Sequence, residues 1–227
     1  EPRIDFGFHN KRSCQTDTAI INGLRDSLKN GDSIIFNQQV LGSINNEGFL
    51  KQANNLFEEF NDKLVLLDSR HYGDKIKNVY RKINDIEAAR LNRIDADPND
   101  AIPVKEVKKQ ALNLYKQSGK PVFVTRGSRG IITVDSAGIH EIPGIQLLAK
   151  LDAVGAGDTT VSAIALCLGG GLSPAETAEF ANYAAAVTVQ KLFQTGTASG
   201  EEILEIAKDT DYIYQPELAE DTRQAHY

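Results

Sequence analysis

The chain has 227 residues, 41% hydrophobic and 25% charged, which is typical of a folded globular protein with its own core. Its formal net charge of −6 argues against nonspecific binding to nucleic acid or to an anionic membrane. No apolar stretch approaches the roughly 18 residues of a transmembrane helix.

The two cysteines and four histidines have none of the spacings of a metal site. Cys167 lies in the apolar run AIALCLGG, so we expect a buried thiol. We therefore expect a cytoplasmic protein with neither a nucleic-acid nor a membrane partner.

The first part of the chain alternates between strand-like and helix-like patterns. The expected elements are a strand at 3–8, a helix at 16–28, a buried strand at 33–38, a helix at 45–60, strands at 63–69 and 78–84, and a short helix at 85–91. Thr16 is the expected N-cap of the first helix, and Gly31 ends it.

The alternation continues to the end of the chain. The expected elements are a helix at 104–119 ended by Gly119, a strand at 121–127, a hairpin at 130–144 turning at 136–138, helices at 157–169, 173–192 and 200–208, and a polar surface tail at 209–227. Short strands between helices predict right-handed βαβ crossovers. We therefore expect one α/β domain over residues 1–227, with three αβα layers and a mainly parallel central sheet.

Polar residues follow three of the expected strands, at 68–70, 84–87 and 125–127. Ligands of open α/β sheets bind beyond the carboxyl ends of the strands. We therefore expect the functional residues at that edge of the sheet.

The stretch LDAVGAGDTTVS at 151–162 places a glycine-rich turn directly before an apolar helical pattern. Gly155 and Gly157 let the backbone approach a ligand, and the unpaired N–H groups of the helix start point to the same place. Asp158, in the first turn, is placed to accept a proton from an incoming hydroxyl, as phosphoryl transfer requires. A helix start with a capping aspartate would use the same residues without a ligand.

Four segments resemble, in order, the PfkB-type or ribokinase-like carbohydrate kinases. DAVGAGDT (152–159) resembles the family's C-terminal signature, and KINDIE (82–87) resembles its N-x-x-E motif. TRGSRG (125–130) resembles its nucleotide segment at a strand end, and ANYAAA (181–186) the helix that lines its adenine pocket. The resemblance implies a ribokinase-like fold and a kinase that transfers the γ-phosphate of ATP to a hydroxyl of a sugar or sugar phosphate.

The resemblance also implies roles for individual residues. Asp158 would be the catalytic base, and the amides of Gly155, Ala156 and Gly157 would form the anion hole. The implied cofactor ligands are Asn84 and Glu87 for Mg²⁺, largely through water; Thr125 and Gly127 for the ATP phosphates or ribose; Asn182 for the base; and Asp152 for a monovalent cation such as K⁺.

These ligands have structural alternatives. Asn84 and Glu87 also fit a capping box at a helix start, and Thr125 and Gly127 a simple strand-end turn. Asn182 also fits a surface position on its helix.

The sequence departs from the family at its start. Family members are usually longer, and their first third supplies a sugar-binding aspartate, a di-glycine motif and the strands of a lid, none of which occurs here. Because the chain starts at Glu1 and contains no methionine, we expect the N-terminal part and the lid to be missing from it. Many relatives dimerise through the lid, so a homodimer is one possibility that the sequence does not decide.

The acceptor is suggested by two shorter segments. DSRH (68–71) and YIYQPELA (212–219) resemble kinases related to the heptose-phosphate kinases of lipopolysaccharide precursor synthesis. Arg70 would then pair with a sugar phosphate, or else with a surface carboxylate.

Two other functions compete with a kinase. A non-catalytic nucleotide- or sugar-binding regulator on the same fold is the alternative. A dinucleotide-dependent oxidoreductase is rejected, because Thr160 stands where the G-x-G-x-x-G fingerprint needs its third glycine.

Overall fold

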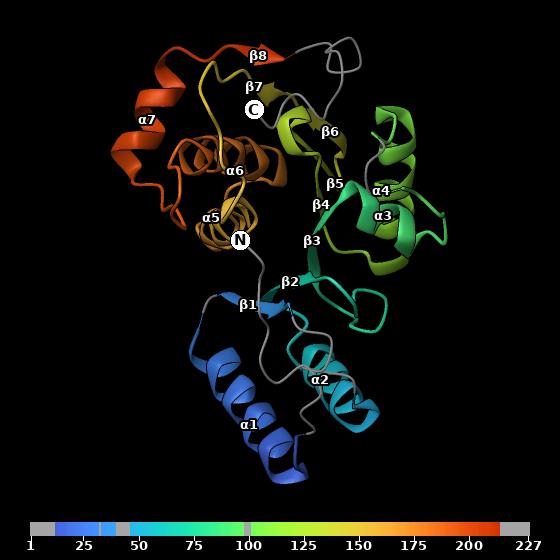
Figure 1. Cartoon of the computed structure of the whole chain (residues 1–227). Helices are drawn as coiled ribbons and strands as arrows, with labels where there is room; N and C mark the ends of the chain where they lie inside the picture. Colours follow the sequence, from blue (N-terminus) through green and yellow to red (C-terminus); the bar gives the residue numbers. More distant parts are fainter. Residues whose placement is uncertain (1–11, 32, 40–45, 98–100, 214–227) are drawn as a thin grey trace. The chain divides into compact units, whose positions relative to one another are not determined.

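The computed structural model describes residues 12–31, 33–39, 46–97 and 101–213, and the strand predicted at 3–8 lies outside them. The chain divides into two compact units, Glu1–Arg81 and Lys82–Tyr227, which we describe one at a time (Figure 1). The prediction of one domain stays a prediction.

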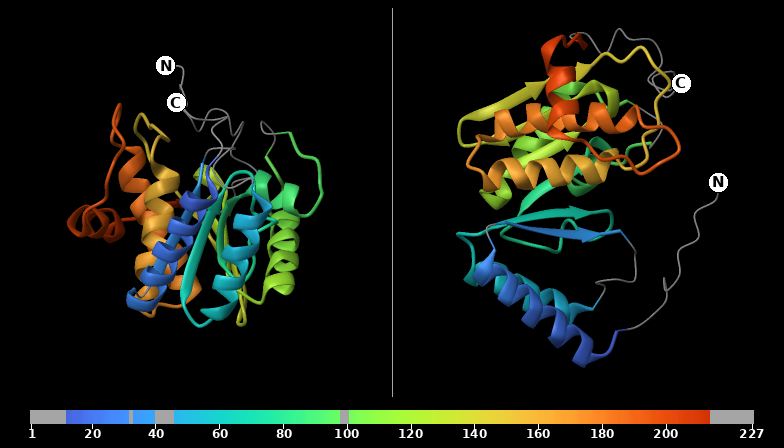
Figure 2. Two further views of the ribbon diagram at one scale, coloured as in Figure 1. Left: turned by 90° about the horizontal axis from the view of Figure 1, so that it is seen from below. Right: turned by 90° about the vertical axis from the view of Figure 1, so that its left-hand side faces the viewer.

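The first unit pairs two strands and covers them with two helices. Its elements are α1 (Cys14–Asn30), β1 (Ser33–Gln38), α2 (Glu47–Glu59), β2 (Leu64–Ser69) and the first two residues of β3 (Tyr80–Asn84). β1 and β2 are parallel, and α1 and α2 lie side by side over them (Figures 1 and 2). The core is formed by apolar side chains such as Phe49, Leu56, Phe57 and Val65.

Two details of this unit differ from the sequence prediction. The N-cap of α1 is Ser13, whose Oγ accepts from the amide of Thr16 at 3.1 Å, so Thr16 lies inside the first turn. Gly31 ends the helix as predicted. The strand predicted as buried at 33–38 has only Gln38 buried in β1, which has one neighbouring strand, β2, among the described residues.

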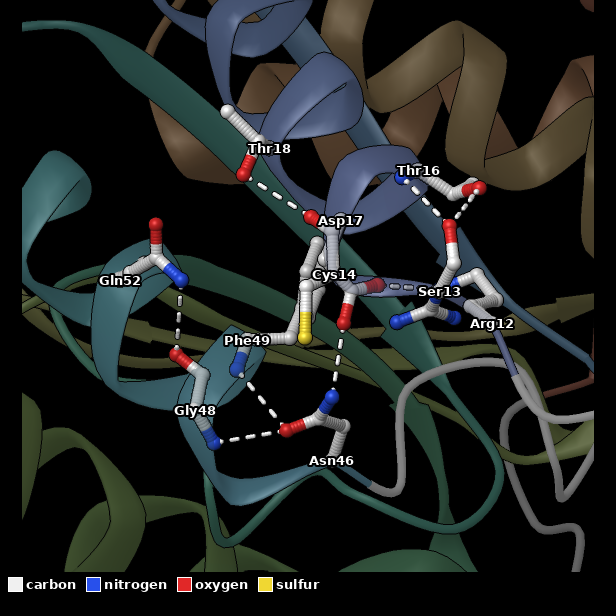
Figure 3. Close-up of polar contacts among 10 residues, drawn as sticks. All are labelled: Arg12, Ser13, Cys14, Thr16, Asp17, Thr18, Asn46, Gly48, Phe49 and Gln52. Atoms are coloured by element: carbon white, nitrogen blue, oxygen red, sulfur yellow. Dashed lines mark hydrogen bonds and ion pairs between the residues drawn. The ribbon is translucent and has the colours of Figure 1, made fainter.

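A buried carboxylate joins the starts of α1 and α2. Asp17, 3% exposed, accepts from Arg12 Nε at 2.6 Å and from Asn46 Nδ2 at 2.7 Å (Figure 3). Asn46 Oδ1 accepts from the Gly48 amide at 2.8 Å, and the Arg12 guanidinium lies 4.7 Å from the ring centroid of Phe49. These bonds compensate the buried charge and fix where both helices begin.

A buried arginine closes the loop between β2 and β3. Arg81 donates to the carbonyl oxygens of Gly73 at 3.4 Å, Ile76 at 2.6 Å and Val79 at 3.3 Å. Burial lowers the pKa of this guanidinium from its ordinary value. The Arg81 side chain therefore supplies hydrogen bonds to loop carbonyls that are not paired in a β-sheet.

We expect Arg81→Leu to lower the free energy of unfolding by about 3 kcal/mol, because three carbonyls lose their donor. Urea denaturation followed by circular dichroism measures this change. Lys77→Leu, at an exposed position of the same loop, is the control and should change it by about 0.5 kcal/mol or less. A loss as small as the control's would show that the loop does not depend on Arg81.

The second unit has three layers. After the last residues of β3 come α3 (Asp85–Leu91), α4 (Val104–Ser118), β4 (Val122–Thr125), the 3-10 turn η1 (Gly127–Arg129), β5 (Ile131–Asp135), β6 (Gly138–Ile142), β7 (Gly144–Ile145), α5 (Ala156–Gly169), α6 (Pro174–Val189), α7 (Gly200–Lys208) and β8 (Tyr212–Ile213). The strand order is β3-β4-β5-β6, and β5 runs antiparallel to β4 and β6. α3 and α4 lie on one face of these strands, and α5 and α6 lie on the other (Figures 1 and 2).

Most predicted elements of this unit are confirmed within one or two residues. The helices at 85–91 and 200–208 agree with the structure, and Gly119 ends α4 in the left-handed conformation, with φ 65°. The helix predicted to reach residue 192 ends at Val189, since residues after it form a loop that bonds to Asp152. Cys167 is buried as predicted, and burial raises the pKa of its thiol.

The predicted tail begins as a short strand. Tyr212 and Ile213 pair with β7, and residues 214–227 lie outside the described residues. Among the helices that the structure describes, none has both the length and the apolar character needed to cross a bilayer.

Candidate functional site

A cavity of about 440 Å³ in the second unit brings distant sequence motifs together. Six of the predicted site residues line it, from three separate segments: Thr125, Gly127, Asp152, Ala156, Gly157 and Asn182. Much of the remaining wall is apolar, including Ile145 and Leu147. Small-molecule sites typically combine this size with apolar walls and a few polar groups.

The glycine turn supplies hydrogen-bond donors at the start of α5. Gly155 is the N-cap, with φ 84°, and a β-carbon there would also lie 3.1 Å from Thr195 Cγ2, so glycine is required. In the described part of the chain no group accepts from the amides of Gly155, Gly157 or Asp158. The amide of Ala156, in contrast, donates to the Ala153 carbonyl at 3.2 Å. Three donors at the positive end of a helix therefore have no acceptor among the described residues.

Asp158 is exposed on the first turn of α5 and does not line the cavity itself, although its neighbour Gly157 does. Its carbonyl accepts from Ser162 Oγ at 2.8 Å. No side chain or amide of the described residues bonds to its carboxylate. The carboxylate is therefore available to an incoming group beside the glycine turn.

The structure adds a cation that the sequence reading did not assign. Lys82, on β3, is 8% exposed, and its Nζ lies 3.3 Å from where a β-carbon of Gly157 would be. Lysine is rarely this buried unless its charge is paired. A lysine in the strand VYRKIN, two positions before Asn84, was the available signal.

Asp152 joins the loop before α5 to the loop after α6. Its Oδ1 accepts from the Val154 amide at 3.0 Å, and its Oδ2 accepts from the Phe193 amide at 3.1 Å. Its own amide donates to the Val189 carbonyl at 2.7 Å. Asp152 thus has a structural role here, whatever else it binds.

Asn84 and Glu87 form the capping box that was their structural alternative. Asn84 Oδ1 accepts from the Glu87 amide at 2.7 Å, and Glu87 Oε2 accepts from the Asn84 amide at 2.9 Å. Neither residue lines the cavity. Thr125 Oγ1 donates to the Ile83 carbonyl at 3.3 Å, which links the end of β4 to the residue before Asn84.

A magnesium site at this position requires few protein ligands. The described residues contain no group of three or more His, Cys, Asp or Glu side chains placed for a metal. Magnesium is usually held by one or two carboxylates together with substrate phosphates and water. The Glu87 carboxylate and the side-chain amide of Asn84 fit that mode of binding.

Asn182 is not a surface residue of its helix. It is 8% exposed on α6, and its Nδ2 donates to the Pro143 carbonyl at 2.7 Å. This bond fixes the orientation of the amide. The side-chain oxygen is therefore the acceptor that remains for a ligand in the cavity.

The DSRH segment ends β2 in the first unit. Ser69 Oγ donates to Gln38 Oε1 at 2.8 Å, and the His71 amide donates to the same oxygen at 3.1 Å. Arg70 is exposed. The buried side-chain amide of Gln38, at the end of β1, therefore holds this segment in place at the end of β2.

Known proteins resemble both the sequence and the fold. The model of the pfkB family carbohydrate kinases matches residues 10–201. The bifunctional protein HldE of Shewanella piezotolerans is 39% identical over 93 residues, which cover 40% of this chain and 19% of that protein. The chain therefore spans about a fifth of the length of this curated relative.

Two solved structures show the fold. Phosphofructokinase-2 from Escherichia coli in complex with potassium matches with a TM-score of 0.66 at 19% identity, covering 83% of this chain and 61% of that one. Ribokinase from Arabidopsis thaliana complexed with ribose and ATP matches with a TM-score of 0.65 at 20% identity, covering 83% and 59%. The predicted three-layer α/β fold with a mainly parallel sheet is confirmed, over about three fifths of these relatives' length. The chain belongs to the pfkB family of carbohydrate kinases and has a ribokinase-like fold.

Proposed function

We propose that this protein transfers the γ-phosphate of ATP to a hydroxyl of a sugar or sugar phosphate. The observation that carries the proposal is the start of α5, where Gly157 lines the cavity. Around it lie three amides without an acceptor among the described residues, a buried lysine and an available carboxylate. Phosphoryl transfer depends on positioning and electrostatic stabilisation, which these groups supply.

Each group has one task in this proposal. Asp158 accepts the proton of the acceptor hydroxyl. The amides of Gly155, Gly157 and Asp158, together with Lys82, stabilise the negative charge that develops on the transferred group. The Ala156 amide joins them only if it leaves the Ala153 carbonyl. Bound ATP supplies the phosphoryl group, and magnesium neutralises part of its charge.

The proposed ligands of ATP and of the cations are residues of the cavity wall and of the neighbouring capping box. We propose Thr125 and Gly127 for the phosphates or ribose, and the Asn182 oxygen for the base. Asn84 and Glu87 would hold Mg²⁺ largely through water, while their capping box keeps both side chains in place. Asp152 would support K⁺ through carboxylate lone pairs that its two amide bonds leave, and the potassium complex of the similar phosphofructokinase-2 supports this part.

The acceptor is proposed to be a sugar phosphate of the heptose-phosphate type. The DSRH segment resembles that branch of the family, and the similarity to HldE is in line with it. Because ATP is a substrate, we propose a cytoplasmic location.

The test is ADP release by the full-length protein with ATP, Mg²⁺ and a panel of sugars and sugar phosphates, beside calorimetric titration with ADP. Turnover on one member of the panel establishes the kinase and names its acceptor. Nucleotide binding without turnover on any member would instead support the competing function, a non-catalytic regulator.

A further inference from the structure

An ion pair joins the start of α3 to the turn η1, and no role given above requires it. Asp85, the first residue of α3, accepts from Arg129 Nη2 at 2.7 Å, and the two side chains keep only 11% and 13% of their exposure. Arg129 Nη1 donates to the Ile102 carbonyl at 3.2 Å, and Asp85 Oδ1 accepts from the Ile86 amide at 3.1 Å. Each side chain therefore bonds both to the other and to a backbone group.

Such a pair is a costly way to join two segments. Its charges lose much of their hydration, and apolar side chains of similar volume often stabilise a fold as well or better. An arginine and a carboxylate add a defined separation and orientation, because the planar guanidinium donates in fixed directions. We therefore look for the role of the pair in the geometry that it fixes and not in the stability that it adds.

The pair lies between two segments with different tasks. Asp85 stands between Asn84 and Glu87, while Arg129 follows Gly127 and Ser128, which line the cavity. Metal and phosphate oxygens bind each other when a nucleotide is present, so these segments must keep a set separation. A misplacement of about 1 Å at such a site costs roughly 100-fold in rate.

We propose that Asp85 and Arg129 are positioning residues that set the distance between the metal-holding and the nucleotide-holding segments. The inference rests on the proposed function of those segments. Arg129 also neutralises Asp85, which keeps this carboxylate from competing with Glu87 for the metal.

The test compares Asp85→Asn, Arg129→Gln and the double variant in the full-length protein. Each single variant should raise the Mg²⁺ concentration for half-maximal rate about tenfold, as loss of an outer support of a metal site does, with the KM of the acceptor unchanged. Calorimetry should show weaker binding of ADP with Mg²⁺ and unchanged binding of ADP in EDTA. The double variant should be no worse than the more severe single one, because both changes remove one interaction.

Two further variants keep the test decisive. Arg129→Lys preserves the charge and loses the fork, so it should give a smaller shift in Mg²⁺ dependence, and it serves where a neutral variant does not fold. Lys108→Gln breaks the 2.6 Å pair with Glu141 between α4 and β6, and it should leave the Mg²⁺ dependence unchanged.

Wild-type Mg²⁺ dependence in folded variants, or effects of the single changes that multiply in the double one, would overturn the positioning role. Either result would be compatible with nucleotide binding by the wild type, so the proposed function would stand. Absence of any ADP binding by the wild type, with or without Mg²⁺, would refute the proposed function and this inference with it. The two failures are thereby distinguished.

Discussion

Asp158→Asn is expected to lower kcat by about 10³-fold, because an amide cannot take the proton of the acceptor hydroxyl. The affinity for ADP should stay unchanged, since the Asp158 side chain does not line the cavity and its backbone amide is retained. Initial rates of ADP formation and calorimetric titration measure the two quantities.

The control for this change is Asp26→Asn, at an exposed position of α1, which should leave both quantities unchanged. Normal turnover in Asp158→Asn would mean that another group is the base. Loss of ADP binding would mean that the carboxylate supports the loop.

Lys82→Met is expected to lower kcat about 100-fold, because a buried cation beside Gly157 stabilises charge that develops during transfer. Methionine has a similar length, so the packing of β3 should be kept. Steady-state kinetics with varied ATP separates the effect on kcat from that on KM.

Lys105→Met, at an exposed position of α4, is the matched control and should have wild-type kinetics. If Lys82→Met raised the KM for ATP and left kcat unchanged, Lys82 would contribute to ground-state binding only.

Local patterns predicted most of the secondary structure. The alternation of short apolar strands with amphipathic helices gave the element order, and Gly31 and Gly119 marked helix ends that the structure confirms. Ser13 and Thr16 both carry a capping hydroxyl, so composition alone did not decide which of them begins α1. The end of α6 was placed too late, because Asp152 holds the following loop through a contact 41 residues away in sequence.

The site was predicted where it depends on local sequence. The turn around Gly155 needs glycine for its backbone conformation and lies at a helix start, and both facts can be read from a few residues. Lys82 and the burial of Asn182 depend on packing between elements far apart in the chain, which spacing does not reveal. The partner of the Ala156 amide likewise follows from the actual turn and not from its composition.

The central claim, that the start of α5 is a phosphoryl-transfer site, is tested most directly by following the γ-phosphate itself. The full-length protein is incubated with Mg²⁺, ATP labelled in the γ-phosphate and the acceptor that releases most ADP. We expect the label in a phosphate ester of the sugar with the wild type, and about 10³-fold less of it with Asp158→Asn. Label found only in inorganic phosphate, or equal transfer by both proteins, would contradict the account.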